Sequence, residues 1–123
     1  MTLATVRSNL MDSFNAVGCV VYDYAPETVI PPAAVCIPAD PYLEIQTIGS
    51  SNTRVLARFQ VVALVAMNNN QASLLNLENL LAAMLAAIPS GYIVSEVSAP
   101  VKTQVGPSDL LTATMVVEVA TTL

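Results

Sequence analysis

Hydrophobic and polar positions follow a helical rhythm in two parts of the chain. Near the N-terminus, apolar residues recur at steps of three and four, and Gly18 favours a helix end because glycine readily adopts the left-handed conformation. A second helix is predicted over about Gln71–Ile88, with Asn68-Asn69-Asn70 as the turn that caps it. The predicted buried stripes are Leu3, Val6, Leu10, Phe14 and Val17 in the first helix, and Leu74, Leu77, Leu81, Met84, Leu85 and Ile88 in the second.

Six other segments carry the alternation or the residue types of strands. They are Cys19–Tyr22, Ala33–Ile37, Tyr42–Gln46, Arg54–Ala66, Tyr92–Ala99 and Leu110–Thr121. The second half of Arg54–Ala66 is apolar on both faces, which is typical of a central strand covered twice. Tyr42–Gln46 and Arg54–Ala66 predict a hairpin that projects outward at Gly49, and Pro100–Asp109 is expected as a long connection. The order predicts an α+β fold in a single domain, residues 1–123: a mainly antiparallel sheet, two flanking helices and a projecting β-hairpin.

A cluster of five prolines lies between Pro26 and Pro41. Proline donates no backbone hydrogen bond, so no central strand or helix is expected here, and Ala33–Ile37 is expected as a short edge strand. Two interpretations stay open: an ordered loop packed on its own domain, or an extended arm that reaches a neighbouring subunit. The residues that such an arm would place in a subunit interface are Val29, Ile30, Pro31, Pro32, Val35 and Ile37.

The composition indicates a protein that binds other proteins more than one that catalyses a reaction. The chain is 54% apolar, with four basic and nine acidic residues and no His, so the commonest general base and metal ligand is missing. We expect no catalytic residue, no metal site and no cofactor. Asp23 with Glu27, or Glu96 with Glu118, could form a carboxylate pair, but carboxylates on strand faces and loops are usually solubilising. Cys19 and Cys36 lie in apolar segments and are expected to be buried and reduced.

Two classes of partner are not expected. The longest apolar runs, Val61–Met67 and Leu80–Ile88, are far shorter than the roughly 20 residues of a membrane-spanning helix. The net charge is −5 and the basic residues are scattered, so clustered cations for nucleic-acid binding are missing. The N-terminus also lacks the pattern of a signal peptide. The high hydrophobicity therefore indicates a large core, a buried protein interface, or both.

The segment Tyr22–Glu44 resembles a known family. It is similar to the N-terminal half of tail terminator proteins from long-tailed (siphovirus-type) bacteriophages, especially those infecting actinobacteria. The matching pattern is Pro-Pro-Ala-Ala-Val, then a short strand, then Asp-Pro-Tyr-Leu-Glu. The resemblance covers nearly the whole chain: the proline-rich motif is its most specific part, and the remainder follows the family's order of elements. Asn68-Asn69-Asn70 departs from the family, in which an Asp is expected at this turn.

The resemblance implies a structural role in the virion. Such subunits form a hexameric ring that caps the finished tail tube, stops polymerisation of the tube protein and provides the surface to which the head–tail connector docks. The location would be the head-proximal end of the tail, and the host cytoplasm during assembly, with DNA only passing through the channel. Alternatives are a head–tail connector, the tail tube protein itself, or a small carboxylate-dependent enzyme.

The tip of the projecting hairpin is the expected contact with the next protein along the tail axis. Small polar residues there tolerate exposure, and one apolar residue, Ile48, suits a partner's pocket. The residues expected in this axial contact are Ile48, Gly49, Ser50, Ser51, Asn52 and Arg54.

Overall fold

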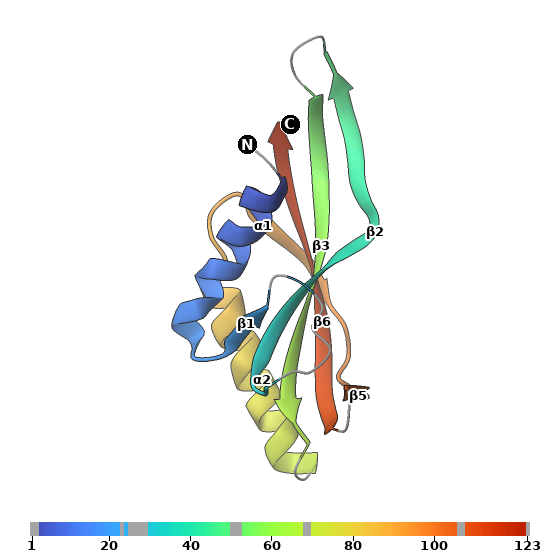
Figure 1. Cartoon of the computed structure of the whole chain (residues 1–123). Coiled ribbons are helices and arrows are strands. Elements are labelled where there is room, and N and C mark those ends of the chain that lie inside the picture. Colours follow the sequence, from blue (N-terminus) through green and yellow to red (C-terminus); the bar gives the residue numbers. More distant parts are fainter. Residues whose placement is uncertain are drawn as a thin grey trace.

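A six-stranded sheet with two helices on one face forms the structure, a computed structural model that describes residues 3–22, 24, 30–49, 53–67, 70–105 and 108–122 (Figure 1). The elements are α1 (Leu3–Asp12), the 3₁₀-helix η1 (Ser13–Val17), β1 (Val20–Tyr22), β2 (Ala33–Ile48), β3 (Thr53–Ala66), α2 (Asn70–Ala87), β4 (Tyr92–Val97), β5 (Val101–Val105) and β6 (Ser108–Thr122). The α+β fold with a mainly antiparallel sheet and two flanking helices is therefore confirmed.

The sheet has the strand order β1-β2-β3-β6-β4, and β5 pairs with β6. Among the described strands, β1 and β2 run parallel to each other, and the other pairs are antiparallel. β3 lies at the centre between β2 and β6, and Ala63, Leu64 and Val65 are all buried although they alternate between the two faces. The prediction of a strand covered twice is confirmed for this end of β3.

The main core lies between the helices and the sheet. Phe14 of η1, Phe59 of β3, Met84 of α2 and Met115 of β6 meet there and are fully buried. The first helix is α-helical only to Asp12, continues as η1, and ends at Gly18, whose φ of 91° is left-handed as expected. The sheet's far face carries a second, smaller cluster of Ala33, Val35, Leu64 and Leu110.

β2 corrects the expectation that no central strand passes through the proline segment. It runs without interruption from Ala33 to Ile48 and includes Pro38 and Pro41. Ala33–Ile37 is therefore not a short edge strand, and its first three residues lie between β1 and β3. Beyond β1, β2 has a described partner only on its β3 side, and its register shifts between Pro38 and Leu43. At a sheet edge and a register shift, a missing N–H removes little from the hydrogen-bond ladder.

The connections after β4 and between β2 and β3 can also be compared with the sequence prediction. Pro100–Asp109 is not only a connection, because it contains β5, which pairs with β6 from Val101 to Val105. β2 and β3 pair as far as Ile48 opposite Thr53, and this paired end lies beyond α1 at the top of Figure 1. Residues 50–52 lie outside the described residues, so the projecting hairpin tip stays a prediction.

Candidate interaction surfaces

The proline segment divides between the domain's own core and its surface. Val35 is only 6% exposed and packs in the small cluster on the far face of the sheet, and Ile37 is half-buried beside it. Ile30, in contrast, is 67% exposed, and its backbone N–H donates to the Tyr22 hydroxyl at 3.4 Å. Val29 lies outside the described residues. The packing favours the ordered-segment interpretation for Val35 and Ile37, and leaves Ile30 available to a partner.

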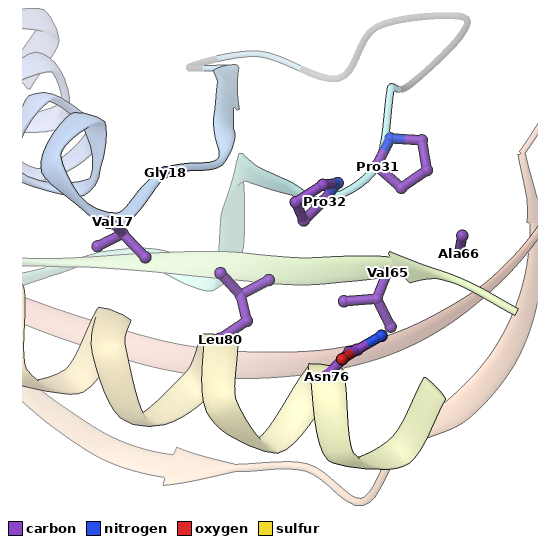
Figure 2. Close-up of a pocket in the computed structure, with 8 residues that line it drawn as sticks. All are labelled: Val17, Gly18, Pro31, Pro32, Val65, Ala66, Asn76 and Leu80. Carbon is purple, nitrogen blue, oxygen red and sulfur yellow. The ribbon is translucent and has the colours of Figure 1, made fainter. Parts of the chain in front are cut away.

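Pro31 and Pro32 form one wall of a hollow of about 300 Å³ (Figure 2). The other lining residues are Val17, Gly18, Val65, Ala66, Asn76 and Leu80. In Figure 2 the two prolines stand on one side, with the side chains of Val65 and Leu80 opposite them. Among the described lining residues, Asn76 supplies the single polar side chain, and none is charged. The hollow can hold an apolar group, but its lining offers no acid, base or nucleophile.

The end of the β2–β3 pair carries exposed apolar side chains. Ile48 is 79% exposed and pairs in register with Thr53, and Ile45 is also exposed although its register partner Val55 is fully buried. Gly49 and Arg54 are exposed as well, whereas Ser50, Ser51 and Asn52 lie outside the described residues. The described part of the predicted axial contact therefore has one large apolar side chain, Ile48, and a second exposed one, Ile45, lies three residues before it in β2, outside the predicted set.

The outer face of α2 is an exposed apolar surface. Ser73, Leu77, Leu80 and Met84 of α2 are buried, and Leu81 and Ala87 are partly buried against the core. Leu74, Leu75 and Leu85 are exposed, Leu75 by 56%, and alanines and asparagines occupy most of the remaining outer positions. The expected buried stripe was therefore wrong at Leu74 and Leu85 and missed Leu80, because the helix is rotated so that these two leucines face outward.

In the described part of the chain, Glu44 and Glu118 form ion pairs between strands and do not form a catalytic pair with Glu96. Arg58 of β3 bonds Glu44 of β2 at 2.7 Å and Glu118 of β6 at 3.3 Å, so one guanidinium joins three strands. The hydrogen bonds to Glu44 and then to Glu118 raise the pKa of the Arg58 guanidinium. Glu96 lines a separate hollow of about 320 Å³ to which Glu118 does not contribute.

The remaining acidic residues and the two cysteines give no indication of a catalytic site among the described residues. Asp23 and Glu27 lie outside the described residues. Cys19 and Cys36 are not bonded to each other, and Cys36 is buried. Burial raises the pKa of the Cys19 thiol, which lowers the thiolate fraction at neutral pH. Nothing in this arrangement resembles an activated nucleophile.

Arg7 of α1 is a candidate binding residue that lies outside the buried stripe predicted for the first helix. The Nε atom is buried and has no hydrogen-bond partner in the described part of the chain. The residue lines a hollow of about 240 Å³ between α1 and β2. No sequence signal marks this arginine, because its burial depends on where α1 lies on β2.

Comparisons with known proteins leave the family open. No family model matches the sequence, and no curated protein matches it either. No helix in the described part of the chain is long and apolar enough to cross a bilayer. The likeness to tail terminators thus rests on the residues of the proline-rich segment and on the order of the elements.

Proposed function

We propose that the protein is a structural tail terminator of a long-tailed bacteriophage. In this role, copies of the chain form a ring, hexameric by analogy with the family, on the end of the tail tube. The ring stops the tube from growing and offers its other side to the head–tail connector. The tube protein and the connector are then its partners, and DNA passes through the ring as cargo.

The observation that carries this proposal is the outer face of α2. A surface helix normally has a strongly polar outer face, whereas this one exposes three leucines and has Glu78 as its single charged residue. Apolar patches of this kind on a monomer usually mark a contact with another protein. Charged residues make up 11% of the chain, against about 25% in an average domain, so little charge is available to keep such a surface solvated.

A second exposed apolar site supports a subunit with more than one neighbour. Ile45 and Ile48 lie at the end of the β2–β3 pair, whereas the end of β3 that carries Val65 and Ala66 lies beside the Pro31–Pro32 hollow. A terminator must bind its own copies laterally and a different protein axially. Exposed apolar groups at separate positions suit this requirement better than a single patch does.

The alternatives make different predictions about assembly. A tail tube protein or a head–tail connector would use similar surfaces, but a tube protein polymerises into long tubes. A carboxylate-dependent enzyme needs two carboxyl groups at one site. Glu118 is held by Arg58, and Glu96 is the one carboxylate among the described residues that line the nearby hollow.

Electron microscopy of the purified protein and of intact tails tests the proposal. We expect single closed rings with an open channel, and density for one such ring at the head-proximal end of the tail. Long tubes would favour the tube protein. A monomer that stays dispersed, together with tails whose head-proximal ring consists of another protein, would contradict the proposed function.

A further inference from the structure

The guanidinium of Arg7 has a buried nitrogen that finds no hydrogen-bond partner among the described residues. A guanidinium has five N–H donors and no acceptor, and leaving a buried charged donor unsatisfied is costly. In the described part of the chain, no acceptor bonds Arg7 Nε, and no ion pair holds the guanidinium. The walls of its hollow are aromatic or apolar, namely Tyr24, Cys36, Ile37, Pro38, Tyr42 and Phe59. The ligand that fits is a carboxylate carried on an apolar surface, because planar carboxylates accept two guanidinium hydrogen bonds at once.

Glu78 is a carboxylate in such a setting. It is the single charged residue of α2 and is exposed, and no described side chain holds it. Positions three and four residues away are its neighbours on the helix surface, and these are Leu74, Leu75, Leu81 and Ala82. The outer face of α2 thus presents one acid within an apolar frame.

Charge complementarity selects this pair from the described residues. Arg58 holds Glu44 and Glu118, and Lys102 lies 3.5 Å from Asp109. Two cations, Arg7 and Arg54, and four acids then lack an ion pair within the described chain; the acids are Asp12, Asp40, Glu78 and Glu96. Among these cations only Arg7 has a buried nitrogen without a partner. Among these acids only Glu78 lies on the leucine-rich face of α2.

We propose that the outer face of α2 in one copy of the chain docks on the α1–β2 hollow of a second copy, with Glu78 bonded to Arg7 of its neighbour. The two surfaces differ, so the contact is head-to-tail, and contacts of this kind close into rings when the rotation allows. The inference rests on the proposed function only in requiring that identical subunits contact one another.

The contact extends beyond the helix face itself. An α-helix of 18 residues is about 27 Å long and about 10–12 Å wide, so its outer face covers roughly 300 Å². A stable interface buries about 800 Å² on each partner. The surroundings of the hollow on α1 and β2 must therefore join the contact, and association of two isolated copies will require high protein concentration.

Charge reversal tests the pair directly. Sedimentation velocity over a protein concentration series would compare the wild-type chain with Arg7→Glu, Glu78→Arg and the variant that carries both changes. We expect each single reversal to raise the dissociation constant about thirtyfold or more, and the double reversal to restore it to within a few-fold of wild type. Glu96→Arg is the matched control, because it reverses a charge on β4 that has no ion pair within the described chain, and it should change association little.

Folding must be checked because Arg7 is half-buried. Circular dichroism melting would identify an unfolded Arg7→Glu chain, in which case Arg7→Met and Glu78→Arg carry the test, since Glu78 is exposed. Single reversals that associate like wild type, or a double reversal without recovery, would overturn the contact.

The outcomes also separate this contact from the proposed function. Rings that persist in micrographs of both single reversals would refute the Arg7–Glu78 pair while leaving the terminator proposal intact. A wild-type chain that never self-associates would overturn the contact, and the head-proximal ring of intact tails would still decide the function. The proposal would also be overturned if Glu78→Arg associated normally while Arg7→Glu stayed monomeric with a lowered melting temperature. Those two results would place the partner of Arg7 within its own chain.

Discussion

Val35 provides a sharp test of which parts of the proline segment belong to the core. It is 6% exposed, pairs in register with Tyr22 of β1 and Val62 of β3, and packs in the cluster with Leu64 and Leu110. Ile30, five residues earlier, is 67% exposed. The sequence pattern nominates both residues for a subunit interface, whereas the structure assigns Val35 to the subunit's own core. Replacing each residue with Asp therefore separates the two roles.

The expected losses follow from burial. Removing the Val35 side chain from the core costs about 1.5–3 kcal/mol, and a buried carboxylate without a partner adds several kcal/mol more. A chain of this length has a free energy of unfolding of roughly 6–18 kcal/mol, so Val35→Asp should remove much or all of it. Val35→Ala deletes two methyl groups and should cost about 2 kcal/mol, or about 5–10 °C in melting temperature. Ile30→Asp should change the free energy of unfolding by no more than about 0.5 kcal/mol.

Thermal and urea unfolding, followed by circular dichroism, measures these differences, and size-exclusion chromatography reports whether each variant is soluble. We expect Val35→Asp to be unfolded or aggregated and Ile30→Asp to melt near the wild-type temperature. A Val35→Asp chain that is folded, soluble and close to wild type in melting temperature would refute the inward position of Val35. It would instead support the arm that reaches a neighbouring subunit.

Three further predictions address other parts of the molecule. The Tyr92 hydroxyl donates to the Val6 carbonyl at 2.8 Å, so Tyr92→Phe should cost about 0.5–1.5 kcal/mol in urea unfolding at pH 7. Burial raises the pKa of Tyr92 above its ordinary value of 10, so the wild-type chain should lose stability as the pH rises above 10. The Tyr92→Phe chain should lose less stability over the same pH range, and an equal loss would contradict the assignment. Cys19 should react with iodoacetamide at pH 8 more slowly than a free thiol, because burial raises its pKa; equal rates in mass spectrometry would show an open thiol. Deleting Ser50–Asn52 should leave the melting temperature nearly unchanged but give tails that overgrow or fail to join heads, and normal infectivity with normal tail length would reduce this loop to a simple turn.

Local periodicity predicts most of the elements because each has a strong pattern of its own. The two helices and the doubly covered end of β3 are visible in the spacing of apolar residues. The path of β2 through Pro38 and Pro41 is not visible in this way, since it depends on the register in which β2 pairs with β3 and on a register shift that accommodates the prolines. β5 is likewise defined by its pairing with β6.

The candidate surfaces were less predictable, because most of them depend on how separate elements pack together. An apolar residue within a polar loop, such as Ile48, can be recognised from neighbouring residues alone. The outward position of Leu74 and Leu85 depends on the rotation of α2 on the sheet, because the helix is apolar on nearly every side and its sequence leaves that rotation undetermined. The unpartnered nitrogen of Arg7 depends on the placement of α1 over β2, a contact between elements that no local pattern encodes.

What separates a terminator from a tube protein is whether the two ends of the subunit fit each other. In the described chain, β3 extends from Thr53, beside the exposed Ile48, to Ala66, beside the Pro31–Pro32 hollow. If Ile48 of one copy filled this hollow in the next, the contact would repeat without closing and produce a filament. A terminator requires the opposite: lateral contacts between copies must close, and at least one end must be recognised by a different protein. The proposed Arg7–Glu78 contact would meet the lateral requirement, because its two surfaces lie on α1–β2 and on α2 and involve neither Ile48 nor Pro31 and Pro32.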